Sequence, residues 1–260
     1  MNAITTPKKL PIPADALSLL AIPMAMLALW VLVTRAQWVP EQLLVSPMKV
    51  IEAAGELWEG GELQEHLQKS LLRLWLGFFT GASLGLIFGV LMGLFKSMED
   101  YCAPFFNALR QIPSIAFIPM LILIFGIDET FKIIIVAKAA FFPVALGGYD
   151  SVRGIPKNYF EVAKVYQCPV WPLIKQVVIP ATVPQILTGL RLSLSRSWMV
   201  LVAAELMAAD SGIGQMMEWG RQMFRMDIVV VGVFITGLIG SALDYGFKWL
   251  ESRLARWKTG

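Results

Sequence analysis

Long apolar segments dominate this sequence and restrict what it can fold into. A helix needs about 20 mostly apolar residues to cross a bilayer, and six segments meet or approach that length, at about 17–34, 74–95, 114–127, 131–148, 186–208 and 228–243. Hydrophobic residues make up 57% of the 260 residues, more than a soluble core of this size buries. The sequence therefore predicts an all-α, polytopic membrane protein with about six transmembrane helices.

The distribution of Lys and Arg predicts how these spans are oriented. Six spans place both termini on one side, together with a polar segment at 150–180. Lys and Arg are more numerous on that side, which indicates that it faces the cytoplasm. No cleavage signature follows the first span, so we expect it to be retained. Cys102 and Cys168 then lie on the reducing side as free thiols.

Several function classes find no support in the residues. A net charge of +3, with scattered Lys and Arg, does not favour nucleic acid binding. The two cysteines have no metal-ligand spacing. Residues 81–85 match the serine-hydrolase elbow, but the single histidine, His66, lies about 25 Å from Ser83 along a continuous helix. We expect no catalytic residues, no metal and no cofactor in this chain.

The second apolar segment carries glycines at strict four-residue spacing. On a helix this spacing produces one smooth, slowly drifting stripe. Such a stripe permits close backbone approach by another helix, so we expect it to face protein rather than lipid. It fits either tight packing in a moving bundle or static packing within the subunit. The stripe consists of Gly77, Gly81, Gly85, Gly89 and Gly93.

Charged residues within the spans are the candidates for a transport pathway, because they are costly in lipid. Arg191, Trp198 and Glu205 recur every seven residues and share one face of the fifth span. We expect Arg191 and Arg196 to snorkel or to pair, and Glu205 to be structural. Lys138 lies in the middle of the fourth span. It fits either an ion pair with a carboxylate such as Glu205 or electrostatic selection of an anionic substrate.

The polar segment at 150–180 predicts a short helix, a turn and a second short helix. Pro156 and Asn158 are suited to a helix start. Pro169 and Pro172 then prevent one continuous helix. A hairpin of this kind fits either a surface element in the headgroup layer or a docking surface for a partner.

This segment resembles a known family. Glu161-Val162-Ala163, followed by Val177 and then Ile179-Pro180, resembles the EAA loop of permease subunits of ATP-binding-cassette (ABC) importers. Further motifs resemble the branch that imports nitrate, bicarbonate, taurine and alkanesulfonates. They lie in order at His66–Arg73, Arg110–Pro119, Phe125–Glu129, Thr188–Arg191, Ala204–Leu206 and Ser211–Gly214.

The resemblance implies a type I importer fold and a set of partners. Two copies of the permease would form the pathway, a cytoplasmic ATPase dimer would bind ATP and the EAA loops, and a periplasmic or lipid-tethered protein would deliver a small anionic solute. The whole would lie in a bacterial inner membrane. The family's loop glycine is Gln167 here, and Pro169 biases Cys168 toward extended geometry. We therefore expect the turn one or two residues after Gln167.

The resemblance also implies a division of the chain. Residues 1–65 would hold the cytoplasmic N-terminus, the first span and an outer amphipathic segment. Residues 66–250 would form the permease core, and 251–260 a basic cytoplasmic tail. A passive channel or a membrane scaffold is the alternative function, because either would explain six spans and a glycine stripe. Neither would explain the EAA-like segment.

Overall fold

The computed structural model describes residues 12–40 and 42–254, except for the side chains of 12–20, 157, 160, 164, 170, 173, 174 and 177. Within the described residues the chain is helical and contains no strand. The elements in order are α1 (Ile12–Arg35), α2 (Pro47–Glu59), α3 (Glu62–Leu94), α4 (Lys96–Leu109), the 3₁₀ turn η1 (Ser114–Phe117), α5 (Ile118–Phe125), α6 (Glu129–Arg153), α7 (Lys157–Val165), α8 (Val170–Leu173), the π turn η2 (Ile174–Val178), α9 (Ile179–Met207), α10 (Ile213–Gln222) and α11 (Met226–Leu254).

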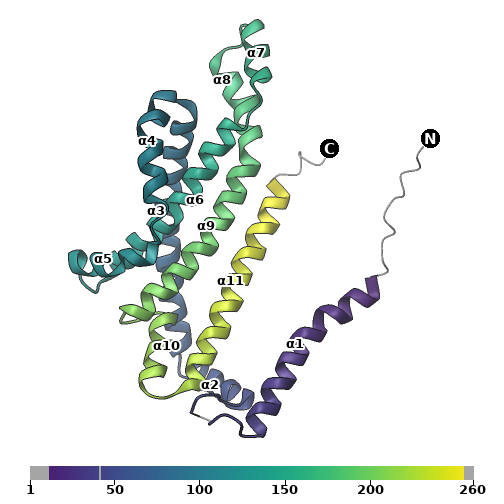
Figure 1. The fold of residues 1–260 in the computed structure, drawn as a ribbon, viewed down its shortest axis with the longest axis vertical. Helices are drawn as coiled ribbons and strands as arrows, with labels where there is room; N and C mark the ends of the chain where they lie inside the picture. Colours follow the sequence, from purple (N-terminus) through teal and green to yellow (C-terminus); the bar gives the residue numbers. More distant parts are fainter. Residues whose placement is uncertain (1–11, 41, 255–260) are drawn as a thin grey trace.

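Four helices are long and apolar enough to cross a membrane: α3, α6, α9 and α11. They run side by side over most of the length of the molecule (Figure 1). α1 is a further apolar helix of 24 residues that leans away from this bundle. Its indole at Trp30 stacks on Phe234 of α11, with ring centroids 6.0 Å apart. The prediction of an all-α, polytopic fold is confirmed.

The predicted third span is not a single straight helix. α4 and the η1–α5 segment together have the composition of a span, but they meet at an angle of 85°. Pro113 stands at the break, where it offers no N–H and keeps Ile112 out of helical geometry. The apolar run of residues 114–127 therefore forms the lower arm of a broken span. Its upper arm is α4, which lies before the segment predicted from the sequence.

The central contact of the bundle is formed by α3 and α6 along the glycine stripe. A Cβ added to Gly81 would lie 2.0 Å from the Ala137 carbonyl oxygen, and one added to Gly89 would lie 2.0 Å from that of Ala145. Gly77, Gly85 and Gly93 face the same helix. The two backbones approach this closely only because no side chain stands between them. The stripe thus lies against protein within the subunit.

The opposite face of α6 packs on α9, so α6 is the middle helix of the bundle. Gly147 and Gly189 meet where these two helices cross. The buried core includes Phe131, Ile135 and Leu201, all fully inaccessible to solvent. A second, smaller core joins α2, α10 and the start of α11, and it includes Leu57, Ile213 and Val231.

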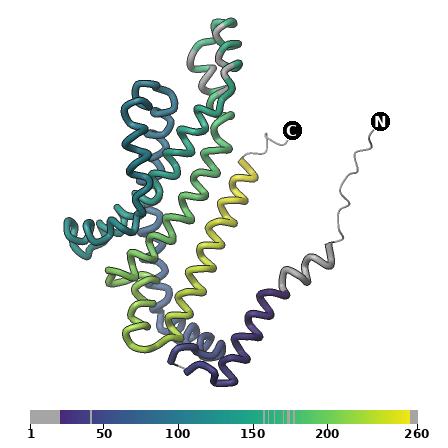
Figure 2. Tube along the Cα trace, in the orientation of Figure 1, coloured from purple at the N-terminus to yellow at the C-terminus, as the bar shows by residue number. Residues whose placement is uncertain are grey.

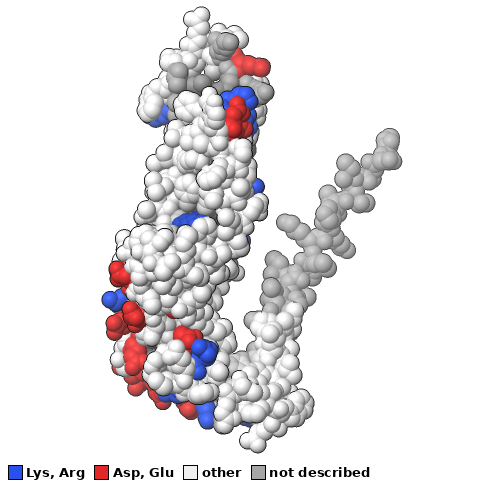
Figure 3. All heavy atoms as spheres, turned by 60° about the vertical axis from the view of Figure 1, so that its left-hand side comes forward, with Lys and Arg blue, Asp and Glu red and all other residues white. Residues whose placement is uncertain are grey.

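The two ends of the molecule differ in structure. α7 and α8 project beyond one end of the bundle, whereas α2 and α10 close the other end (Figures 1 and 2). The described start of α1 and end of α11 both point toward the α7–α8 end. Charged atoms gather toward the two ends on the face shown in Figure 3, and a patch of Lys or Arg atoms interrupts the uncharged band between them.

Candidate functional site

The α7–α8 hairpin presents apolar and aromatic side chains to solvent. Tyr166 is 81% exposed and Trp171 is 72% exposed. Glu161 and Val162 are also exposed, whereas Ala163 is half-buried. A hollow of about 440 Å³ lies between the two short helices and is lined by Val162, Ala163 and Tyr166 among others. A surface this apolar at the tip of a membrane protein is typical of a protein-binding site.

The loop residues named from the sequence occupy different parts of this hairpin. Glu161, Val162 and Ala163 lie on α7, and Ile179 and Pro180 begin α9. Val177 falls in η2, and its side chain lies outside the described residues. The hairpin therefore joins the end of α6 to the start of α9 through its two short helices.

The turn that ends α7 is made at Gln167 itself. Gln167 has φ 47°, in the left-handed region, and the Cys168 N–H donates to the Ala163 carbonyl at 2.8 Å. This six-residue closure is the Schellman arrangement, in which the left-handed position is usually glycine. The expectation that the turn falls one or two residues later is wrong. Pro169 restricts only Cys168, which follows the left-handed residue, so it does not displace the turn.

A buried polar cluster ties four elements together at the opposite end of the bundle. The Arg73 guanidinium on α3 donates to Glu129 at 2.5 and 2.6 Å, to Glu205 at 2.8 Å and to the Ser211 carbonyl at 2.5 Å. Ser70 donates to both oxygens of Glu205, at 2.8 and 2.9 Å. Arg73 and Glu205 are each about 1% exposed.

The loop before α10 completes this cluster with backbone groups. The Gly214 N–H donates to Glu205 at 3.1 Å, and the Gly212 N–H donates to His66 Nδ1 at 3.0 Å. Gly212 has φ 115°, and a Cβ there would lie 2.3 Å from the Glu205 carboxyl carbon. Only glycine therefore fits this position. Lys132 on α6 also donates to Glu129, at 3.4 Å, so two cations face two carboxylates. With its charges balanced, the cluster has the chemistry of a structural clasp.

The clasp shows what the motif segments have in common. His66–Arg73, Phe125–Glu129, Ala204–Leu206 and Ser211–Gly214 each contribute polar groups to it. Sequence reasoning placed these segments in order but did not foresee that they converge, and it did not single out Arg73. One signal was present: Arg73 is a charge at the edge of an apolar run, and such a charge needs a partner.

Lys138 does not pair with Glu205, whose carboxylate is occupied by Arg73, Ser70 and Gly214. Its ammonium lies 4.1 Å from the ring centre of Phe117 and 5.2 Å from that of Phe142. It also donates to the Ile112 carbonyl at 3.4 Å. The ion-pair interpretation of Lys138 is therefore wrong. Glu205 is buried at the end of the span, and the cation that lies beside it there is Arg73.

The remaining members of the seven-residue series face neighbouring helices of the same subunit. Arg191 lies 3.3 Å from Asp244 and 3.2 Å from Glu251, both on α11. Trp198 is 2% exposed, and its indole N–H donates to the Thr236 carbonyl at 3.0 Å. Arg191, Trp198 and Glu205 thus form contacts within the subunit in this structure.

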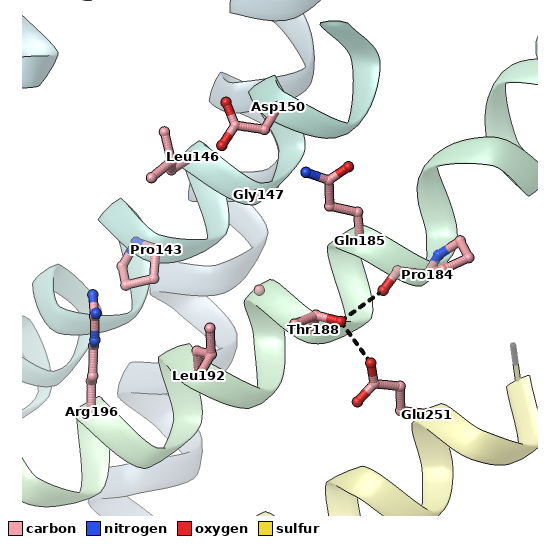
Figure 4. A pocket seen from close by; sticks show the side chains of 11 residues that line it. Pro143, Leu146, Gly147, Asp150, Pro184, Gln185, Thr188, Leu192, Arg196 and Glu251 are labelled. Carbon is pink, nitrogen blue, oxygen red and sulfur yellow. Dashed lines mark hydrogen bonds between the residues drawn. The ribbon is translucent and has the colours of Figure 1, made fainter. Parts of the chain in front are cut away.

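A cavity of about 490 Å³ opens on the α6–α9 face. Figure 4 shows Arg196 and Pro143 at one end of it and Asp150 at the other, with Gln185 and Thr188 between them. Thr188 is held by Glu251, to which its hydroxyl donates at 2.6 Å. Within the described residues, no three His, Cys, Asp or Glu side chains are placed to hold a metal ion.

Comparison with known proteins decides the family. Residues 81–256 match the family described as the binding-protein-dependent transport system inner membrane component. The chain belongs to this family. It is a permease of the ABC transporter class, a multi-pass membrane protein and not an enzyme. Membership implies ATPase and substrate-binding partners for this permease.

The permease is similar over most of its length to proteins of related name. It is 38% identical over 239 residues to an aliphatic sulfonates transport permease protein, SsuC, of Bacillus subtilis, covering 92% of this chain and 87% of that protein. It is 31% identical to the taurine transport system permease protein TauC of Escherichia coli, covering 89% and 86%. It is also 31% identical to the bicarbonate transport system permease protein CmpB of Synechococcus elongatus, covering 72% and 68%.

A solved structure shares the fold of this permease. An inward-facing structure of the MetNI methionine ABC transporter superposes with a TM-score of 0.61 at 16% identity, covering 74% of this chain and 95% of that chain. A second crystal form gives a TM-score of 0.56 at 18% identity. The likeness supports the type I importer fold predicted from the sequence.

Proposed function

We propose that this permease imports a small organic or inorganic anion, of the sulfonate, taurine, nitrate or bicarbonate type, and that the α7–α8 hairpin couples it to cytoplasmic ATPase subunits. The observation that carries the coupling is the hairpin itself, with its exposed aromatic side chains and its hollow beside Ala163. Relatives named for sulfonate, taurine and bicarbonate transport support the substrate class.

The hairpin is placed to transmit movement to the bundle. It joins α6 directly to α9, and α6 is the helix against which both α3 and α9 pack. A displacement of the hairpin by an ATPase would therefore shift the α6–α9 pair relative to its surroundings. This is a two-state element biased by a partner that binds ATP, and the free energy comes from that partner.

The base of the hairpin has a brace that fits this role. Glu99 on α4 pairs with Arg153 and accepts from the Tyr149 hydroxyl at 2.6 Å, both near the end of α6. The brace fastens α4 to the element that carries the hairpin. α4 would then move together with α6 when the hairpin is displaced.

The orientation, partners and assembly follow from the same proposal. The α7–α8 end and both termini would face the cytoplasm, and the α2–α10 end would receive a binding protein. Two copies of the permease would form the pathway. In this arrangement the clasp of Arg73 and Glu205 lies at the outer end, where it would keep α3, α6 and α9 together while their inner ends separate.

The test is a charge placed on the hairpin. Ala163→Glu puts a carboxylate in the half-buried hollow, and we expect it to abolish ATP-dependent uptake and ATPase copurification while the permease remains in the membrane. Ser252→Glu is the control, because Ser252 is an exposed residue near the same end on α11. Normal uptake and normal copurification in Ala163→Glu would exclude the hairpin as the coupling element. Uptake without any copurifying ATPase would favour a passive channel.

A further inference from the structure

Arg196 stands in the middle of a span and is exposed on the α6–α9 face. It lies about 16 Å from the end of α9 at Met207 and about 25 Å from the start of that helix. Among the residues that the structure describes, its side chain makes no hydrogen bond or ion pair. Snorkelling serves only residues near a helix end, so Arg196 does not reach an interface.

A second cation lies at nearly the same depth. Lys138 is about 14 Å from the start of α6, and its described neighbours are two aromatic rings and one carbonyl, with no carboxylate. Lys138, Arg196 and Arg110 line one hollow of about 320 Å³. Its walls are apolar, and they include Ile115, Phe142 and Met199.

A face with these charges does not fit lipid. A single Lys or Arg at the centre of a bilayer costs at least about 2.5 to 3.5 kcal/mol on insertion scales. Two unpaired cations that share a hollow add mutual repulsion to this cost. Water or an anion lowers both the insertion cost and the repulsion, whereas a hydrocarbon tail lowers neither.

We propose that Arg196 and Lys138, with Arg110 at the rim, form a binding site for a small organic anion on the α6–α9 face, midway along the transport route. The substrate class rests on the proposed function; the site rests on the geometry. A guanidinium offers paired N–H donors to a sulfonate or carboxylate, and the ammonium adds a point charge. The apolar wall then accommodates a short alkyl chain.

The site connects with the cavity of Figure 4. Arg196 and Pro143 line both spaces, so the hollow at Lys138 continues along α6 and α9 toward Asp150. The charge of the lining changes along this groove, from two cations in the middle to the carboxylates of Glu251 and Asp150 toward the α7 end. An anion held at Arg196 would meet no such carboxylate until it had passed toward the hairpin.

Charge-selective labelling of a nearby cysteine tests the site without a known substrate. Met199→Cys is suitable, because Met199 lines the hollow and is 69% exposed. Cys102 and Cys168 are replaced by Ser in the full chain, which is kept in membrane vesicles. Two water-soluble methanethiosulfonates are compared, one with a sulfonatoethyl group and one with a trimethylammonioethyl group. With either reagent, the thiolate introduced at position 199 forms a mixed disulfide with the reagent's thioalkyl group and releases methanesulfinate.

We expect the anionic reagent to react at least about tenfold faster than the cationic one, relative to their rates with a free thiol, because both nearby cations favour an anion. Arg196→Gln and Lys138→Met should each lower this preference, and the double variant should lower it furthest. Butanesulfonate should slow the labelling, and butanol should not. Leu43→Cys, in the loop before α2, is the control, because Leu43 is as exposed as Met199 but lies outside the spans, and it should show no such charge preference.

Four results would overturn the site. The first two are equal rates for the two reagents, and no labelling by either reagent because lipid or a second copy of the chain seals the face. The other two are a charge preference that is undiminished in the double variant, and labelling that butanesulfonate does not slow. None of these measurements involves an ATPase, so failure of the coupling proposal would be seen separately, as uptake without copurification.

Discussion

At the scale of single residues, Gln167 carries a conformational cost that the sequence could indicate only in part. The absence of the family's glycine suggested a displaced turn, yet the helix ends at the same position with a non-glycine residue at positive φ. The closing hydrogen bond from Cys168 to Ala163 outweighs the preference of one side chain. A local propensity argument does not include that bond, so it misplaced the turn.

Gln167→Gly should therefore stabilise α7. A non-glycine residue in the left-handed region costs roughly 1–2 kcal/mol, part of which glycine regains, so a gain of about 1 kcal/mol is expected. Hydrogen exchange at the amides of Tyr166 and Cys168 should slow by roughly fivefold. Gln167→Val should accelerate it, since a β-branched side chain tolerates positive φ poorly. Unchanged exchange in both variants would contradict the turn geometry.

Glu205 gives the second prediction at this scale. Glu205→Gln removes the charge that faces Arg73 inside the bundle, and breaking a buried pair typically costs about 3–5 kcal/mol. We expect a large loss of protein yield and of thermal stability in detergent. Arg73→Met combined with Glu205→Met should recover part of that loss.

Lys138→Met provides the matched comparison for that pair. Lys138 and Glu205 have different partners, so their effects on the free energy of unfolding should add independently. A rescue of Glu205→Gln by Lys138→Met would show that the two residues interact after all. It would contradict the placement of Glu205 with Arg73.

At the scale of elements, the spacing of glycines and prolines predicted the shape of individual helices but not which helices pack together. The four-residue period of glycines indicated a smooth helix face, and the proline-rich stretch at 150–180 indicated two short helices. The glycine spacing could not identify α6 as the helix that packs on the stripe, because a face of small residues accepts any helix that fits. The break between α4 and α5 was missed because hydropathy over 114–127 is uniform, while one residue, Pro113, sets the angle.

Gly81→Ala tests the closest helix contact in the bundle. Even one methyl group there would meet the Ala137 backbone at 2.0 Å, so α3 and α6 must separate. We expect a loss of about 1–3 kcal/mol, the range for overpacking, seen as a lower midpoint of thermal unfolding. Gly237→Ala in α11 is the control, because a Cβ there meets nothing within 4 Å. Equal midpoints for the two variants would contradict the packing.

At the scale of the whole molecule, the sequence predicted the class of the protein better than the positions of its charges. Hydropathy and the ordered motifs predicted the family, to which the chain belongs. The clasp, whose residues lie between positions 66 and 214, could not be predicted from a single sequence, because no local pattern specifies which polar residues meet across four elements. The same holds for Arg196, which becomes informative only once its helix face is known to be exposed.

The central claim is that an ATPase docks on the α7–α8 hairpin, and crosslinking from Cys168 tests it most directly. Cys168 is a native, exposed residue in the hairpin turn. In a Cys102→Ser background, a short thiol-to-amine crosslinker should join it to the copurifying ATPase, with a yield that changes when ATP is added. Met223→Cys in a chain without Cys102 and Cys168 places the thiol at the α10 end and should give no such product. Crosslinking from Met223→Cys but not from Cys168 would contradict the account.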